Sequence, residues 1–502
     1  LFFSEKNLEI NIDDSARDFH AYFGTQDRNV KVTNACQWNV SDEKVVSVRN
    51  GKLEPVGNGT ATVSATYTRK GKTYTAECSV VVKGDPGIAS GKCGDNLKWR
   101  ITQDHTLVIF GTGDMWDYSV DYVGGTTTPT APWYKYSPKK IIIREGITRI
   151  GENAFGKCDS LTGELVIPDG VTSIGGFAFS LCSGLSGALE IPDSVTRIGA
   201  RAFDDCTGFT GNLKLPAMLT DLGGGAFNEC SGLSGALEIP DSVTRIGAYA
   251  FGDCTGFTGN LKLPAMLTDL GGGAFSGCSG FTGDLIIPEG VTSIGDHTFG
   301  WCSGFSGRLV LPSTVTSIGN GAFFDCNFIG RLNIPDNVTN IGDMAFWKCD
   351  GFAGRLVLPS KVTSIGESAF ASCNFSGNLI LPDGLKTIGE GAFRFCGGFT
   401  GDLIIPNSVT NVGTGAFEQC EGFDGELILS NSLTEVENWT FSFTNFTGTL
   451  VIPEGVVQIG EHAFACVFDV ESVEIPESLE RIGEAAFSGV RAKDVWYAGT
   501  SK

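Results

Sequence analysis

The sequence predicts a mainly β protein: a right-handed solenoid of about fifteen repeats of 23 or 24 residues, preceded by a small β-sandwich and a capping segment. The first observation is one pattern that recurs from residue 141 onward, and such a period indicates a solenoid. The second is the 69 Gly and 18 Pro, which interrupt secondary structure too often for long helices. The third is a run of short alternating strands before residue 84. The predicted boundaries are 1–83 for the sandwich, 84–140 for the cap and 141–502 for the solenoid.

Each repeat is predicted to form one coil, as in residues 189–206, with the sequence LEIPDSVTRIGARAFDDC. Leu189 and Ile191 are two positions apart, so both point to one side of a short strand, and Pro192 ends its pairing. The return path is predicted to be a short turn or 3₁₀ segment, with Gly199 relieving the backbone at a second corner. The apolar residues of this return path are Val195, Ile198, Phe203 and Cys206.

The repeats are expected to stack into one continuous core. The repeated Phe marks the period and falls at positions 155, 179, 203, 227, 251, 275, 299, 323, 346, 370, 393, 417, 441, 464 and 487. A single coil cannot enclose its own apolar residues, but stacking places Leu on Leu, Phe on Phe and Cys on Cys. Residues 183–230 and 231–278 are a recent duplication that differs only at Arg201/Tyr249, Asp204/Gly252, Asn228/Ser276 and Glu229/Gly277. A faithful duplication favours a scaffold over a catalytic site.

The pattern Ile-Pro-x-x-Val-Thr-x-Ile-Gly-x-x-Ala-Phe-x-x-Cys closely resembles the BspA-type leucine-rich repeats of bacterial surface proteins, over about 350 residues. This resemblance implies a curved leucine-rich-repeat solenoid on a bacterial cell surface or in secretion, adhering to host matrix proteins, other bacteria or glycans. The last repeats depart from the pattern, because Ser430 replaces the Pro, Glu437 the Gly and Thr444 the Cys. Residues 495–500 resemble a terminal motif of the family that normally continues, so we expect the native chain to extend beyond Lys502.

Residues 1–83 are predicted to form a small sandwich of strands separated by Gly-containing turns at residues 50–51, 58–59 and 70–71. From Trp38 onward, the segment is similar to bacterial group 2 immunoglobulin-like domains, which implies a stalk or spacer outside the cell. Cys36 lies near the start of one strand and Cys78 within the last. A disulfide across the sandwich and two free thiols are both compatible with this spacing.

Residues 84–140 are predicted to contain a hairpin, with 97–101 paired to 106–110, followed by an aromatic-rich stretch. A solenoid needs a cap over the exposed end of its core. The first interpretation is therefore that these aromatic residues cover the first repeat. The alternative is a platform on which carbohydrate rings stack. The aromatic residues are Trp116, Tyr118, Tyr122, Trp133, Tyr134 and Tyr136.

Charge and composition exclude several classes of partner. The 36 Lys and Arg against 57 Asp and Glu give a formal net charge of −21, which repels nucleic acid and anionic membrane surfaces. The sequence contains no apolar run long enough to span a membrane. Both observations favour a chain that acts outside the membrane.

No catalytic or metal-binding constellation is found in the sequence. Twelve of the sixteen Cys, from Cys158 to Cys420, occupy one repeat position, which predicts a ladder of buried thiols rather than metal ligands. The four His lie in different segments, without a nucleophile or carboxylate at a motif spacing. We therefore expect a protein that is not an enzyme and that needs no cofactor or metal.

The candidate site is the exposed side of the Leu-x-Ile strands, expected to be the concave face of the solenoid. The middle residue of each strand is mostly charged before residue 270 and mostly aliphatic afterwards, interrupted by Asn333. Arg308, Arg331 and Arg355 stand beside this stripe on consecutive coils and are expected to lie side by side. The structural alternative is that β-branched residues simply favour strands. The aliphatic residues are Ile286, Val310, Val357, Ile380, Ile404, Ile428 and Val451.

These observations favour an adhesin or recognition protein, extracellular or on a bacterial cell surface, whose solenoid binds an extracellular protein such as a host matrix protein. The alternative is a glycan-binding accessory protein in which aromatic platforms make the contact. A second, smaller candidate patch precedes the Cys position on the other side of the coils. Its residues are Trp301, Phe324, Trp347, Phe395 and Phe443.

Overall fold

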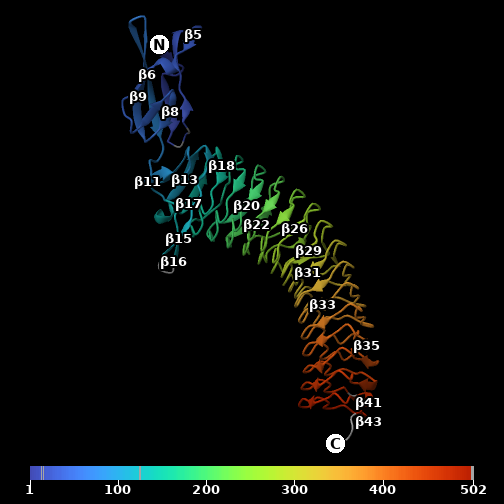
Figure 1. Ribbon diagram of the computed structural model, residues 1–502. Helices are drawn as coiled ribbons and strands as arrows, with labels where there is room; N and C mark the ends of the chain where they lie inside the picture. The colour runs from blue at the N-terminus through green and yellow to red at the C-terminus, as the bar shows by residue number, and fades with distance from the viewer. Residues whose placement is uncertain (13, 15, 124–125, 468, 499–502) are drawn as a thin grey trace. The chain divides into compact units, whose positions relative to one another are not determined.

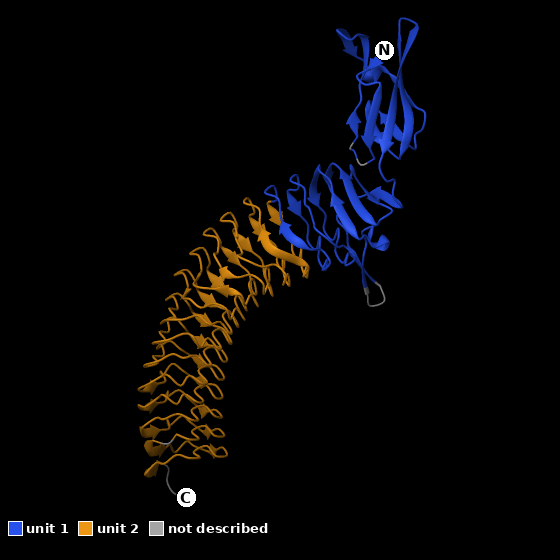
Figure 2. Cartoon of the chain, turned by 180° about the vertical axis from the view of Figure 1, so that it is seen from behind, with its two compact units in different colours: residues 1–195 blue, residues 196–502 orange. Residues whose placement is uncertain are grey.

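The computed structural model describes residues 1–12, 14, 16–123, 126–467 and 469–498 (Figure 1). Within these ranges the chain is mainly β, with strands β1 to β43 and two short 3₁₀ helices, η1 (Thr33–Ala35) and η2 (Tyr134–Tyr136). The described residues form no helix that is long and apolar enough to cross a membrane. The chain divides into two compact units, residues 1–195 and 196–502 (Figure 2). That division falls inside the repeats, so the predicted boundaries at 83 and 140 stay predictions.

The first unit begins with three small sheets around a common apolar core. The turns Asn50-Gly51 and Lys70-Gly71 have positive φ at both residues, as two-residue hairpin loops require. One sheet has the order β1 (Phe2–Phe3), β4 (Ala21–Thr25), β5 (Arg28–Lys31). The second has the order β2 (Asn7–Asn11), β10 (Lys72–Lys83), β9 (Gly59–Arg69), β6 (Gln37–Val40), and the third β3 (Arg17–Asp18), β8 (Lys52–Pro55), β7 (Val46–Arg49).

The Cys36–Cys78 disulfide, one of the two expectations, is not formed. Both thiols are free, and Cys36 directly precedes β6, which belongs to the same sheet as the β10 strand of Cys78 rather than to a facing sheet. Gln37, next to Cys36, lies opposite Thr66 of β9, whereas Cys78 of β10 lies opposite Val63 of that strand. Two strand spacings of about 4.8 Å separate the cysteines, which already exceeds the roughly 7 Å between Cα atoms that a disulfide can bridge.

The capping segment contains the expected hairpin, formed by β12 (Leu97–Ile101) and β13 (Thr106–Gly111). β11 (Ala89–Lys92) pairs with β12, and β17 (Lys140–Ile143) runs parallel to β13 and leads into the repeats. The remaining strands of this unit are β14 (Gly113–Asp114), β15 (Val120–Val123), β16 (Thr126–Pro129), β18 (Ile147–Ile150), β19 (Ser173–Ile174) and β20 (Gly187–Glu190).

Trp133 confirms the capping interpretation of this segment. Its side chain is fully buried, its ring stacks on Phe155 of the first repeat at 5.5 Å between centroids, and its Nε1 donates to the Ala154 carbonyl. Trp99 and Tyr118 pack edge-on against it. Trp116 and Tyr122, in contrast, are exposed, so only part of the aromatic stretch covers the core.

Each coil of the second unit contributes to two parallel ladders. The first ladder consists of the Leu-x-Ile segments: β22 (Phe209–Lys214), β28 (Leu285–Ile286), β30 (Leu309–Val310), β35 (Leu403–Ile404), β37 (Leu427–Ile428), β39 (Gly448–Val451), β41 (Val470–Ile475) and β43 (Asp494–Tyr497), with isolated bridges between them. β25 (Gly259–Asn260) pairs with β27 (Phe281–Thr282) just before this ladder position.

Part of the return path, for which a turn or 3₁₀ segment is expected, forms a second ladder of short strands. The expected turn follows each strand, as at residues 200–205 after Arg197–Ile198. The strands of this ladder carry Ile, Leu or Val after a Thr-rich corner, and extended pairing with the next coil suits such residues better than a 3₁₀ turn. They are β21 (Arg197–Ile198), β23 (Asp221–Leu222), β24 (Arg245–Ile246), β26 (Asp269–Leu270), β29 (Ser293–Ile294), β31 (Ser317–Ile318), β32 (Asn340–Ile341), β33 (Ser364–Ile365), β34 (Thr387–Ile388), β36 (Asn411–Val412), β38 (Glu435–Val436), β40 (Gln458–Ile459) and β42 (Arg481–Ile482).

The core of the solenoid is a stack of identical rungs. The rings of Phe275 and Phe299 stack at 5.6 Å with 5° between their planes, and most neighbouring rungs do the same. A second column of Phe, after the Cys, packs edge-on against the first, as Phe281 does against Phe275. Both geometries are favourable for aromatic pairs. The expected core of stacked Leu, Phe and Cys is therefore confirmed.

The Cys column is a ladder of buried thiols. The thiol of Cys302 donates to the carbonyl of Phe275 in the preceding coil at 3.0 Å, and the same bond recurs along the column. Burial raises the pKa of these thiols, to about 12 for Cys349, so the nucleophilic thiolate is suppressed. The ladder thus fills the core and satisfies one carbonyl per coil.

We predict that denatured, unreduced protein titrates sixteen thiols with a disulfide-exchange reagent. In the native protein, only the partly exposed Cys36 and Cys466 should react at an appreciable rate, because the other Cys side chains are buried. A count of ten or fewer in denaturant would contradict the free-thiol ladder.

Candidate functional site

Seven aliphatic side chains of the first ladder are exposed and form what we call the apolar stripe. Their exposed fractions range from 40% for Val310 to 60% for Val357. On either side of each one in the sequence, the flanking Leu and Ile are buried, as for Leu309 and Leu311 around Val310. The strand alternation places the stripe on the solvent side. Its members are Ile286, Val310, Val357, Ile380, Ile404, Ile428 and Val451.

Register places the members of the stripe on consecutive coils. Ile286 lies opposite Val310, Asn333 opposite Val357, Val357 opposite Ile380, and Ile404 opposite Ile428. The second ladder pairs without a break from β29 to β36, so the coils between these strands are in register throughout. The sequence prediction of one exposed aliphatic residue per coil, interrupted by Asn333, therefore agrees with the structure.

The three arginines beside the stripe are exposed, but they are not equivalent. Arg308 donates from its Nη2 to Asp284 at 3.2 Å, and its backbone N–H donates to the same carboxylate at 2.7 Å. The backbone bond first, and the guanidinium second, hold the pKa of Asp284 below its usual value. Within the described ranges, the structure gives Arg331 and Arg355 no ion pair. Asp402, a candidate acidic neighbour, instead accepts a hydrogen bond from the Glu426 backbone.

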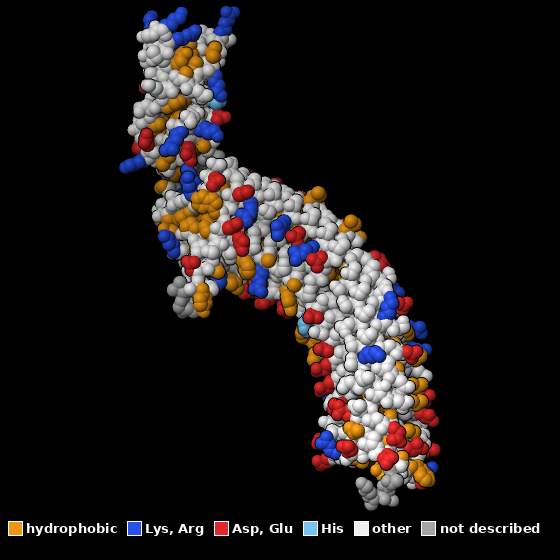
Figure 3. Space-filling model, in the orientation of Figure 1, with side chains coloured by type: hydrophobic (Ala, Val, Ile, Leu, Met, Phe, Trp, Pro, Cys, Tyr) orange, Lys and Arg blue, Asp and Glu red, His pale blue; other side chains and the backbone are white. Residues whose placement is uncertain are grey.

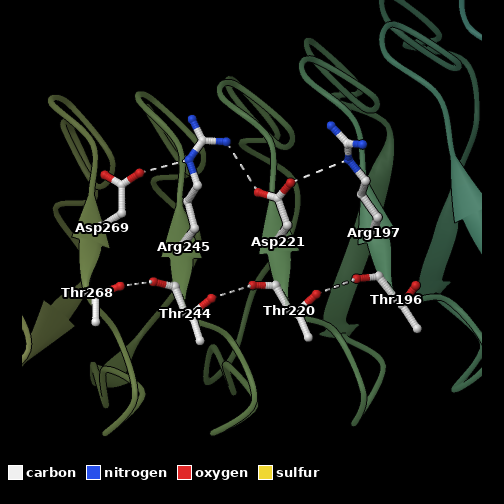
Figure 4. A network of polar contacts seen from close by, with 8 residues as sticks. All are labelled: Thr196, Arg197, Thr220, Asp221, Thr244, Arg245, Thr268 and Asp269. Atoms are coloured by element: carbon white, nitrogen blue, oxygen red, sulfur yellow. Dashed lines mark hydrogen bonds and ion pairs between the residues drawn. The ribbon is translucent and has the colours of Figure 1, made fainter.

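A fully paired charge ladder on the same solenoid provides the comparison (Figure 4). On the second ladder, basic and acidic residues alternate from coil to coil, and Arg245 contacts Asp221 at 3.3 Å and Asp269 at 2.8 Å. Arg197 contacts Asp221 at 3.4 Å. Beside them, the Thr220, Thr244 and Thr268 hydroxyls donate to the Thr carbonyl of the preceding coil. Here the arginines link neighbouring coils through ion pairs, whereas Arg331 and Arg355 form no such pair among the described residues.

Sequence reasoning missed this charge ladder. Its signal is an Arg or Asp at 24-residue spacing directly before the buried Ile or Leu of the return path. On the face shown in Figure 3, acidic and basic side chains accordingly intermingle over the coils around β22 to β26.

Before the apolar stripe, the first ladder carries charges and borders a groove. Glu238 lies opposite Lys262 in the ladder, but the Lys262 amine contacts Asp241 at 3.6 Å, at the corner that follows the strand. The ion pair of Lys262 is therefore made with the turn and not with Glu238 across the strands. A groove of about 780 Å³ lies over these strands and is lined by Asn212, Lys214, Ala236, Glu238, Asp241 and Lys262, among others.

The aromatic patch on the turns before the Cys column is partly contiguous. Trp301 and Phe324 meet edge to face at 4.9 Å, and Phe324 lies 5.0 Å from Trp347. Trp301 also stacks on His297, whose buried Nδ1 has no hydrogen-bond partner among the described residues. Phe395 is exposed on a separate coil under Arg394. The patch is therefore a cluster of three aromatic rings, not a continuous row.

Chemical groups that could support catalysis or metal binding are not brought together. The described residues contain no cluster of three or more His, Cys, Asp or Glu side chains that could hold a metal ion. The four His remain in separate parts of the fold. What the surface offers is an exposed set of columns, which is suited to recognition.

A stack of such coils, with a buried Leu, Phe and Cys core and exposed ladders, defines a leucine-rich-repeat solenoid. The family model described as "BspA type Leucine rich repeat region" matches six times, at residues 127–255, 185–306, 226–353, 306–424, 352–447 and 400–498. These matches cover well over half of the chain, so the chain belongs to the BspA-type leucine-rich-repeat family. This family and fold are of bacterial surface type, typically non-enzymatic, and indicate recognition of proteins.

Several solved structures of bacterial proteins are similar to this chain. A leucine-rich repeat protein from Bacteroides ovatus is 26% identical, with a TM-score of 0.49, covering 79% of this chain and 91% of that one. One from Eubacterium ventriosum is 20% identical, with a TM-score of 0.37 and coverages of 80% and 95%. The pneumococcal vaccine antigen PcpA is 16% identical, with a TM-score of 0.36 and coverages of 82% and 100%. No curated protein matches the sequence.

We predict that replacing both Arg331 and Arg355 by Ser leaves the melting temperature unchanged or slightly raised, because two unpaired like charges on neighbouring coils repel each other. Arg245→Ser, which removes two ion pairs, should lower the stability by up to about 1 kcal/mol at low salt. Thermal unfolding followed by circular dichroism measures both. Unfolding of the double variant would show that these arginines are structural.

Proposed function

We propose that the protein is a secreted or cell-surface bacterial adhesin that binds an extracellular protein through the apolar stripe, with host matrix proteins as the first candidates. The observation that carries this proposal is the stripe itself. Its seven aliphatic side chains are exposed on one side of the ladder, whereas the Leu or Ile on either side of each of them in the sequence is buried. Exposed apolar surface of this extent is characteristic of interaction sites.

The charges beside the apolar stripe also suit recognition of a partner. The chain has a net charge of −21, yet unpaired cationic side chains stand directly beside the stripe. An apolar surface edged by charge gives both affinity and selectivity for a partner. An N-terminal immunoglobulin-like sandwich would serve as the spacer that holds the solenoid away from the cell envelope.

A glycan-binding role is the second candidate, favoured by the contact cluster of Trp301, Phe324 and Trp347 and by the exposed Trp116. Aromatic side chains offer an apolar face with a polar edge, which suits sugar rings. This role would use the turns or the cap and not the first ladder.

The test is a screen of the purified full chain against immobilised matrix proteins and a glycan array, repeated with the Ile380→Asp and Ile404→Asp double variant. We expect a matrix-type protein to be captured, and the double variant to bind at least about tenfold more weakly, since two charges would be desolvated in the contact. Val166→Asp is the matched control, because Val166 occupies the same repeat position outside the stripe and is at least as exposed, at 69% against 58% for Ile380 and 53% for Ile404.

Unchanged binding by the double variant, with an unchanged melting temperature, would exclude the stripe as the site. Loss of binding on Trp301→Ala alone, with retention by the stripe variants, would identify the glycan role instead.

A further inference from the structure

The middle of the apolar stripe contains a polar notch formed by Arg331, Asn333 and Arg355. Asn333 takes the place of an aliphatic residue in the stripe, and the two arginines stand two positions before Asn333 and Val357 on adjacent coils. All three are exposed. The notch is bordered by Ile286 and Val310 on one side and by further aliphatic residues on the other.

The backbone leaves room for the Arg331 side chain to extend toward the next coil. A Cβ placed on Gly354 would lie 3.5 Å from Nε and 3.6 Å from Cγ of Arg331, so the arginine stem extends along the glycine of the next coil. Gly354 has a φ of +77°, where a side chain is rarely found, and so leaves this path open. The Arg331 guanidinium is thereby directed toward the coil that carries Arg355.

Among the residues that the structure describes, no acidic side chain forms an ion pair with either of these two guanidinium groups. Asp284 forms its ion pair with Arg308, and the carboxylate of Asp402 accepts a hydrogen bond from the backbone N–H of Glu426. On the second ladder of the same chain, by contrast, Arg245 is held between two Asp residues. The notch therefore offers two guanidinium groups to an external carboxylate, which arginine binds in a bidentate manner.

The spacing of the coils selects the conformation of a bound segment. The stack repeats about every 4.8 Å, and an α-helix returns to the same face every turn of about 5.4 Å. An extended strand presents a side chain to the same face every two residues, about 6.7 Å apart. Its side chains therefore fall out of step with the roughly 4.8 Å spacing of the coils within two coils. Strand addition is excluded in any case where the stripe strands already pair with their neighbours, as β28 does with β30.

We propose that the stripe binds an amphipathic helix of a protein partner, with the helix axis along the stack of coils and an acidic residue of the helix in the notch. This proposal rests on the proposed function. The helix presents aliphatic side chains to Ile286 and Val310, then Asp or Glu to Arg331 and Arg355, then aliphatic side chains to Ile380 and Ile404. The pitch mismatch of about 0.6 Å per coil adds up to about 3 Å over the six coils from Ile286 to Ile404, which is less than one turn of the helix.

The test uses two displayed peptide libraries of about 18 residues, selected on the purified full chain. One library is helix-forming and randomised on one face, and the other carries Pro at regular intervals and cannot form a helix. We expect enrichment from the helical library alone, with Asp or Glu at a central position and aliphatic residues one turn to either side. Selected peptides should bind the Arg331→Ser and Arg355→Ser double variant about tenfold more weakly, with a smaller difference at high salt.

Arg197→Ser with Arg245→Ser is the matched control, because it removes two arginines that internal acids already pair, and selected peptides should bind it as they bind the unaltered chain. Enrichment without a central acid, enrichment from the Pro library, equal binding to the double Ser variant or no enrichment would each overturn the helix proposal. A captured matrix protein that depends on Ile380 and Ile404 but not on the arginines would overturn it while leaving the proposed function in place.

Discussion

Backbone hydrogen bonds between successive coils are the interaction on which the rest of this structure depends. The Phe227 N–H donates to the Ala250 carbonyl and the Phe275 N–H to the Thr298 carbonyl, each one coil further along. A coil by itself encloses no core, since its Leu, Phe and Cys side chains are covered only by the same residues of its neighbours. The hydrogen bonds fix the register in which the Leu, Phe and Cys side chains of neighbouring coils stack on one another. The ring stacking and the thiol ladder both follow from that register.

The same register turns every surface position into a column, and this constrains charge. A basic residue repeated on each coil would face its own copy about 4.8 Å away, which is unfavourable. The second ladder meets this constraint by alternating Arg and Asp from Arg197 to Asp269. The first ladder departs from it at Arg331 and Arg355, and departures from a local rule are expected where a surface has a function beyond folding.

The recent duplication shows which parts of a coil are free to vary. All four differences between residues 183–230 and 231–278 lie on the turn between the second ladder and the Cys column. Arg201 and its counterpart Tyr249 both have positive φ, near 54°, with side chains at the surface. Neither the core rungs nor the first ladder tolerated a difference between these copies, because each rung must match the coil on either side.

The sequence by itself determined the repeat, its period, the core residues and the exposed aliphatic stripe, because residue alternation and a 24-residue spacing act locally and recur in every coil. It also determined the capping hairpin, from 97–101 and 106–110. Only the tertiary structure decided that the return path pairs as a second strand, since that pairing needs the neighbouring coil as partner. The tertiary structure likewise separated Cys36 from Cys78 by a full strand, and it paired Arg308 while leaving Arg331 and Arg355 to solvent. Those outcomes depend on which side chains come within contact distance across coils and sheets. The spacing of residues along the sequence does not determine that distance.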